Sequence, residues 1–125
     1  VKRVVPLGVD GAFHSRLMQP ARDGFRAELA GLTLAAPSIP LMQNVVGAPV
    51  EDPAEISRNL EAQITGSVRW ESCVRAMLDL NPDLFVELGP GNVLSGFMRR
   101  IDRTAACCAV SNTEELAAAV EKIKA

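Results

Sequence analysis

The sequence predicts an α/β protein in which a parallel sheet is flanked by helices. Short apolar segments alternate with segments whose apolar residues recur every three or four positions, as expected for strands that alternate with amphipathic helices. Strands joined through helices run parallel, and a parallel sheet is covered on both faces. With 125 residues, 48% of them hydrophobic, the chain has the size of one ordinary domain and can bury a core.

The first half of the chain is expected to hold two strands and two helices. Residues 4–9 and 39–46 are the strands, the first of them confined by its proline to a sheet edge or an irregular entry. A helix is predicted over 20–31, from the proline tolerated in its first turn to the glycine that ends it. Asp52 followed by Pro53 marks the start of a second helix. Three apolar residues of that helix are expected to face inward: Ile56, Leu60 and Ile64.

The second half is predicted to alternate helix and strand, ending in a helix: residues 70–78, 84–88, 93–101, 105–110 and from Asn112 onward. The helix over 70–78 has the clearest pattern, because its apolar residues repeat at i, i+3, i+4, i+7 and i+8. The last helix opens with Asn112 and Glu115, the same capping pattern as at Asp52.

Composition excludes several functional classes. The formal charge is -2 and the five aromatic residues include no tyrosine, which argues against nucleic acid as a partner. Every apolar run is far shorter than the roughly 20 residues of a membrane span, and the N-terminus has no signal-peptide pattern, so we expect a soluble cytoplasmic protein. Cys73, Cys107 and Cys108 lack a metal-binding spacing and are interpreted as small buried apolar residues, which leaves no metal site and no disulfide framework.

His14 is the one histidine and the strongest candidate for chemistry. It follows an apolar strand and two glycines, where ligands gather at the carboxyl edge of a parallel sheet. A structural role for this histidine stays open on the residues alone. A hydrolase would need a serine at a G-x-S-x-G elbow, which the sequence lacks; Ser15 adjoins His14 and Ser95 lies within a predicted helix, so neither is a credible nucleophile.

Two interpretations are open for the segment GPGNVLSG at residues 89–96. A glycine-rich turn that opens a helix can aim backbone N–H groups at an anion. It lacks both the G-x-G-x-x-G spacing and the Walker Lys-Ser/Thr pair, which favours an ordinary strand-to-helix turn. An alternative function is therefore a self-contained small α/β module that binds an anion or a partner, in which His14 is incidental.

Four segments occur in an order that resembles a known family: GVDGAFHSRLMQPA at 8–21, QNV at 43–45, QITGSVRW at 63–70 and FVELGPGNVLSGFMRRI at 85–101. Together they resemble the C-terminal half of the malonyl-CoA:acyl carrier protein transacylases of bacterial fatty acid synthesis. The resemblance implies that residues 1–9 are the last strand of a small ferredoxin-like subdomain. Residues 10–125 would be the C-terminal part of the hydrolase-like acyltransferase subdomain.

The resemblance also implies an activity. Family members transfer malonyl from coenzyme A to the phosphopantetheine thiol of acyl carrier protein through a serine ester, with malonyl-CoA as substrate and no cofactor. His14 matches the histidine that acts as general base and then acid. Gln63 matches the glutamine whose backbone carbonyl orients that histidine, and Phe13 matches the position that favours malonyl over methylmalonyl. The alternative reading of Phe13 as plain core is compatible with that role.

The family's serine, its carboxylate-binding arginine and its oxyanion-hole groups belong to an N-terminal half that this sequence does not contain. We therefore expect the chain to be inactive alone. Sheet edges and helix faces left without neighbours should make it associate with the missing half or form a homodimer. The residues that contact coenzyme A or acyl carrier protein are not predicted.

Overall fold

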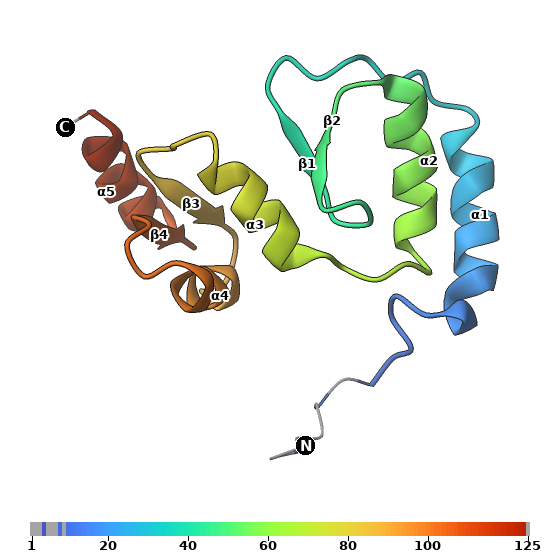
Figure 1. The fold of residues 1–125 in the computed structure, drawn as a ribbon, viewed down its shortest axis with the longest axis horizontal. Coiled ribbons are helices and arrows are strands. Elements are labelled where there is room, and N and C mark those ends of the chain that lie inside the picture. Colours follow the sequence, from blue (N-terminus) through green and yellow to red (C-terminus); the bar gives the residue numbers. More distant parts are fainter. Residues whose placement is uncertain (1–3, 5–7, 9, 125) are drawn as a thin grey trace. The chain divides into compact units, whose positions relative to one another are not determined.

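The computed structural model describes residues 4, 8 and 10–124, and its chain divides into two compact units, Val1–Arg69 and Trp70–Ala125 (Figure 1). The strand expected over 4–9 lies outside the described residues apart from Val4 and Gly8. No helix among the described residues is both long enough and apolar enough to cross a bilayer.

The first unit contains a short 3-10 helix, two α-helices and a hairpin: η1 (Arg16–Met18), α1 (Gln19–Leu29), β1 (Leu41–Gln43), β2 (Ala48–Val50) and α2 (Pro53–Gln63). The helix predicted over 20–31 is confirmed as α1, with Pro20 in its first turn. Asp52 caps α2 as predicted, because its Oδ2 accepts a hydrogen bond from the N–H of Glu55 at 2.7 Å.

The strand predicted over 39–46 is only partly confirmed: its residues 41–43 form β1, and the turn that follows leads into a second strand, so the segment belongs to a hairpin. β1 pairs antiparallel with β2, and the turn between them closes through the N–H of Gly47, which donates to the Gln43 carbonyl at 2.8 Å. Gly47 has a φ of 73°, in the left-handed region that glycine adopts at little cost. The apolar run predicted a strand, but this reversal depends on backbone geometry that an apolar pattern does not report.

The inward-facing residues of α2 are only partly as predicted. Ile56 is buried and Ile64 half-buried, whereas Leu60 is 38% exposed. Leu60 lines the wall of a cavity of about 160 Å³ between β1 and α2. The prediction for Leu60 is therefore wrong in this unit, because its side of α2 faces an open hollow instead of a packed neighbour.

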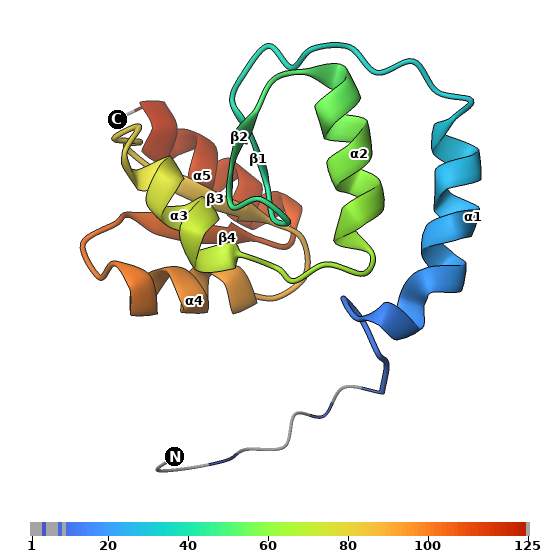
Figure 2. The ribbon, with the colours of Figure 1, turned by 45° about the vertical axis from the view of Figure 1, so that its right-hand side comes forward.

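The second unit alternates helix and strand: α3 (Trp70–Leu78), β3 (Phe85–Leu88), α4 (Val93–Ile101), β4 (Cys107–Val110) and α5 (Thr113–Lys124). β3 and β4 pair in parallel, from Phe85 opposite Cys107 to Leu88 opposite Val110. In Figure 2, α4 and α5 lie on opposite sides of this pair of strands. The predicted α/β class with a parallel sheet flanked by helices is confirmed.

The core of this unit is centred on α3. Val74 is fully buried and Cys73 is 1% exposed, as the amphipathic pattern predicts. The same interpretation is wrong for Cys107 and Cys108, which are half-buried. They lie on β4, whose sheet has only two strands among the described residues, so one edge of the strand is left without a neighbour.

The cap predicted for the last helix is confirmed. Asn112 Oδ1 accepts from the N–H of Glu115 at 2.8 Å, and the Glu115 carboxylate accepts from the N–H of Ser111 at 2.6 Å. The Glu115 side chain therefore bonds back to Ser111, the residue before the cap, and gives an acceptor to a backbone N–H that lies outside α5.

Candidate active site

The backbone at His14 is held in an unusual conformation. Its φ of 58° lies in the left-handed region, which histidine, asparagine and aspartate visit more often than other residues with a Cβ. The next residue caps η1: the Ser15 hydroxyl donates to the Ala12 carbonyl at 2.7 Å and accepts from the N–H of Leu17 at 3.3 Å. The Ser15 hydroxyl is thus engaged by the backbone, in agreement with its rejection as a nucleophile.

The structure brings His14 and Gln63 together although 49 residues separate them. Nδ1 of His14 lies 2.8 Å from the backbone carbonyl oxygen of Gln63. A carbonyl oxygen only accepts hydrogen bonds, so Nδ1 must carry a proton, and in the neutral ring the free lone pair is then on Nε2. Gln63 is the last residue of α2, where carbonyls have no donor within the helix. The imidazole therefore satisfies a helix end and is itself left able to accept a proton.

An ion-pair cluster joins α2, which ends at Gln63, to α1, which begins five residues after His14, and Figure 1 shows α1 running beside α2. Glu61 Oε1 accepts from Arg22 Nε at 2.9 Å and from Arg26 Nη2 at 2.6 Å. Arg22 also donates to the Thr65 hydroxyl at 3.3 Å. These contacts lie on the turn of α2 that ends at Gln63, so they fix the approach of α1 to the histidine's acceptor.

The cluster also predicts a dependence of stability on pH. The hydrogen bond from Arg26, followed by that from Arg22 and the charges of both, lowers the pKa of Glu61 from 4.5 to about 2, against the opposing effect of burial. A lowered carboxyl pKa stabilises the fold above the unfolded value, and this contribution is lost as pH falls from about 4.5 to about 2. Urea midpoints measured across that range should fall less steeply in Glu61→Gln than in wild type. The exposed Glu28→Gln serves as the control, and equal slopes for all three proteins would contradict the prediction.

Phe13 is not a core residue. The residue is 64% exposed, so the interpretation of Phe13 as an ordinary core residue is wrong. The ring lies over Gly11, where a Cβ atom would come within 2.4 Å of it. Phe13 is therefore an accessible ring next to the histidine, resting on a position without a side chain.

The QNV segment has a structural role that the sequence did not reveal. Gln43 is buried; its Nε2 donates to the Ile56 carbonyl at 3.2 Å and its Oε1 accepts from Asn59 at 2.9 Å. The Asn44 carbonyl accepts from the N–H of Arg69 at 2.8 Å. These bonds tie the hairpin to α2 and to the segment after it. No local pattern reports such contacts, since each partner is at least 13 residues away.

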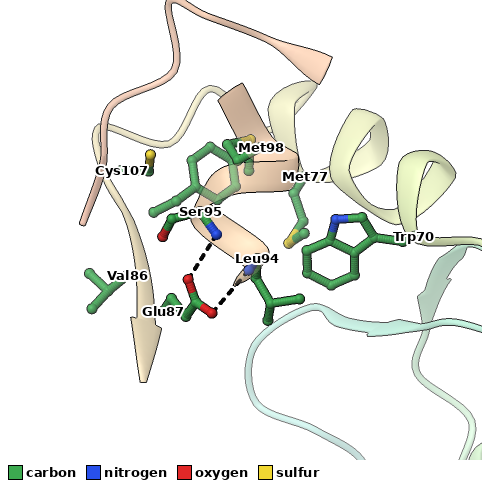
Figure 3. A pocket seen from close by; sticks show the side chains of 9 residues that line it. Trp70, Met77, Val86, Glu87, Leu94, Ser95, Met98 and Cys107 are labelled. Carbon is green, nitrogen blue, oxygen red and sulfur yellow. Dashed lines mark hydrogen bonds between the residues drawn. The ribbon is translucent and has the colours of Figure 1, made fainter. Parts of the chain in front are cut away.

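The backbone N–H groups of the glycine-rich segment at 89–96 already bind a carboxylate of the same chain. The carboxylate of Glu87, on β3, accepts from the N–H of Leu94 at 3.0 Å and from the N–H of Ser95 at 2.8 Å (Figure 3). The bond from Ser95 is the largest influence that lowers the pKa of this carboxyl. Ser95 itself is buried at 7% exposure. This arrangement favours the ordinary strand-to-helix turn over a site for an external anion.

The pocket beside this cap offers little chemistry. It has a volume of about 160 Å³ and is lined mostly by apolar side chains, with Trp70, Leu94 and Met98 around it (Figure 3). Its one acidic side chain, that of Glu87, already accepts hydrogen bonds from two backbone N–H groups of α4. Across the part of the chain that the structure describes, no three His, Cys, Asp or Glu side chains are grouped to hold a metal ion.

Removing the internal cap should destabilise the second unit. Glu87→Ala leaves the first N–H groups of α4 without their acceptor, and we expect Tm to fall by roughly 4–8 °C, as for the loss of one good helix cap in a domain of this size. The control Glu71→Ala removes an exposed i,i+4 pair with Arg75 and should change Tm very little. Thermal unfolding of the two variants is the measurement. An equal fall in Tm for both would show that the Glu87 cap stabilises the unit no more than an exposed ion pair does.

The sequence and the fold match the same set of proteins. No protein-family model matches the chain. It is 32% identical over 123 residues, 98% of its length, to the malonyl CoA-acyl carrier protein transacylase of Bacillus subtilis. It is 44% identical over 77% of its length to a polyketide-biosynthesis malonyl CoA-acyl carrier protein transacylase of Bacillus velezensis, of which it covers 33%.

Solved structures agree. The acyl-carrier-protein S-malonyltransferase of Burkholderia pseudomallei superposes with a TM-score of 0.86 and 39% identity over 96% of this chain and 39% of that one. The chain matches the C-terminal portion of malonyl-CoA:acyl carrier protein transacylases. A transacylase solved in complex with a type II polyketide acyl carrier protein superposes with a TM-score of 0.87 and 33% identity, over 97% of this chain and 39% of that one.

These matches confirm the resemblance drawn from the four segments. The Bacillus subtilis transacylase matches 98% of the chain, so the match includes the segments that carry Phe13, His14 and Gln63. The chain spans 39% of the length of that transacylase. The roles of Phe13, His14 and Gln63 stay predictions.

Proposed function

We propose that this chain is the histidine-bearing part of a transferase that moves malonyl from malonyl-CoA to the phosphopantetheine thiol of acyl carrier protein in the cytoplasm. The observation that supports it is the His14–Gln63 contact of 2.8 Å, which leaves Nε2 free as a base on a chain that matches the transacylases. The alternative of an anion-binding module has less support, because Glu87 already occupies the N–H groups it would use.

The proposed chemistry consists of two acyl transfers. Nε2 of His14 takes the proton of a serine hydroxyl as the serine oxygen attacks the malonyl thioester carbonyl. The bond between carbonyl carbon and sulfur breaks, and the imidazolium returns its proton to the coenzyme A thiolate. The carrier thiol then attacks the serine ester, giving its proton to Nε2, and the serine oxygen leaves and takes that proton back. No external cofactor is needed for either half.

The serine of this scheme comes from outside the chain. The sequence has no G-x-S-x-G elbow, the Ser15 hydroxyl is bonded to the backbone, and Ser95 is buried in α4. We propose that the nucleophile, the arginine for the malonyl carboxylate and the oxyanion-hole groups are supplied by residues equivalent to the N-terminal portion of the transacylases.

The surface of the second unit supports the need for a partner. Leu88 is 74%, Val93 61% and Ile123 66% exposed, and the parallel sheet has only two strands among the described residues. A pair of parallel strands is rarely stable without neighbours. We propose that the N-terminal portion or a second copy covers these side chains. Analytical ultracentrifugation of the 125-residue chain should show self-association, and a monodisperse monomer would contradict the homodimer.

The decisive experiment measures covalent malonylation. The intact mass of the chain alone should be unchanged after incubation with malonyl-CoA. A chimera in which the chain replaces the matching portion of the Burkholderia pseudomallei enzyme, 39% identical, should gain one malonyl group and pass it to acyl carrier protein. A malonyl adduct on the chain alone would refute the external serine, and a folded chimera without an adduct would refute the proposed activity.

The carrier protein can belong to fatty acid or polyketide synthesis, since relatives of both kinds match. We propose the fatty acid carrier as the acceptor. Transfer by the chimera to the two carriers, compared at equal concentration, tests the choice, and faster transfer to the polyketide carrier would reverse it.

A further inference from the structure

Gln63 contributes more than its backbone carbonyl. Any residue at the end of α2 would present a backbone carbonyl to His14, whereas the carboxamide is a contribution of the Gln63 side chain itself. Its Nε2 lies 3.2 Å from the carbonyl oxygen of Gly66 and 3.3 Å from Nδ1 of His14. The carboxamide therefore lies between the turn that follows α2 and the imidazole ring.

The contact with Gly66 fixes the orientation of the amide. Nε2 donates to the Gly66 carbonyl; a reversed amide would set two acceptor oxygens 3.2 Å apart. Nδ1 of His14 already donates to the Gln63 carbonyl at 2.8 Å and has no lone pair left for Nε2. The 3.3 Å approach is thus a packing contact beside the ring, and the bond to Gly66 is the one that the carboxamide makes.

Stability alone does not explain a glutamine here. Its Oε1 is buried and has no hydrogen-bond partner in the described part of the chain. A buried acceptor without a donor is unfavourable, and polar groups kept for stability are normally paired. Gln43 is the contrasting case, since both ends of its carboxamide are bonded, to Ile56 and to Asn59.

We propose that the carboxamide of Gln63 is a positioning group for His14: by bonding Gly66 it holds the last peptide of α2 so that the Gln63 carbonyl stays on Nδ1–H and Nε2 stays the free nitrogen. The catalytic consequence rests on the proposed function. The positioning itself is a property of this chain and can be measured without any reaction.

The first test uses the imidazole ¹⁵N chemical shifts of the 125-residue chain, which has a single histidine and therefore one pair of signals. In the neutral ring of the wild type we expect Nδ1 to be protonated and Nε2 to be unprotonated. In Gln63→Met the two shifts should move toward each other as the ring exchanges between tautomers. Tm should change little, because the loss of the bond to Gly66 and the loss of the unpaired buried Oε1 act in opposite directions. In the matched control Gln43→Met, Tm should fall and the imidazole shifts should stay as in wild type.

A wild-type ring that already averages between tautomers, or a Gln63→Met ring identical to wild type, would overturn the proposal. So would an equal change in Gln43→Met, which would mean general loosening of α2. These outcomes depend on the ring alone, so they separate the proposal from the activity assigned above.

The second test is kinetic. In the active chimera, Gln63→Met should lower kcat by about 10- to 100-fold with little change in KM, as expected when a base is misplaced by a fraction of an ångström. If the chimera is active and Gln63→Met changes neither kcat nor the tautomer of His14, the positioning role is refuted and the proposed transferase function stands. If the chimera is inactive but Gln63→Met still changes the tautomer of His14 in the 125-residue chain, the positioning role stands and the proposed function is refuted.

Discussion

Replacing His14 with asparagine should reduce malonyl transfer by the chimera about 10²- to 10⁴-fold, the usual contribution of a general base. Asparagine also tolerates the left-handed backbone at φ 58°, and its amide N–H can take the place of Nδ1 toward the Gln63 carbonyl. What it lacks is the nitrogen equivalent to Nε2. The variant thus removes the base and keeps the bond that ties residue 14 to α2, and the measurement is the rate of malonyl transfer to acyl carrier protein.

The control for this experiment is Ser15→Ala. Ser15 adjoins the histidine and caps η1, so its loss tests local disturbance and the idea of a nucleophile within this chain together. We expect its transfer rate to stay within a few-fold of wild type. If His14→Asn retained the full rate with an unchanged Tm, His14 would not be the base. If Ser15→Ala abolished the adduct, the serine would lie in this chain after all.

Replacing Phe13 with serine should shift selectivity toward methylmalonyl. The exposed ring next to His14 can occupy the space of an α-methyl group, and one methyl is worth about 1–3 kcal/mol, or roughly 10- to 200-fold. We therefore expect the ratio of kcat/KM for methylmalonyl-CoA to that for malonyl-CoA to rise by that factor in the chimera. Turnover of malonyl-CoA should change little, because the role proposed for the ring is only to occupy the space of the α-methyl group.

Two further variants show whether the place of the ring matters. Gly11→Ala puts a Cβ within 2.4 Å of the ring atoms of Phe13 and should push the ring aside, giving a smaller shift in the same direction. Leu17→Ser alters another exposed apolar side chain, 71% exposed, and should leave the ratio as it is. An unchanged ratio in Phe13→Ser would assign selectivity to residues outside this chain.

The sequence alone was sufficient to predict most of the helices, two of their caps and the family. The helices over 70–78 and 93–101 and the caps at Asp52 and Asn112 were predictable, because periodicity and capping depend on residues only three or four positions apart. The order of four segments was enough to predict the match with the transacylases, and it singled out His14.

Contacts between distant residues were decided only by the tertiary structure. The carbonyl on Nδ1 comes from 49 residues away, and the arginines on Glu61 from 35 and 39 residues away. From the sequence, Glu87 is only one residue of a predicted strand. In the structure its carboxylate accepts the N–H groups at the start of α4, which the glycine-rich segment could otherwise present to an external anion. Hydrogen bonds and ion pairs form wherever folding brings donor and acceptor together, so local periodicity indicates which face of an element is buried and leaves the partners of its polar side chains unspecified.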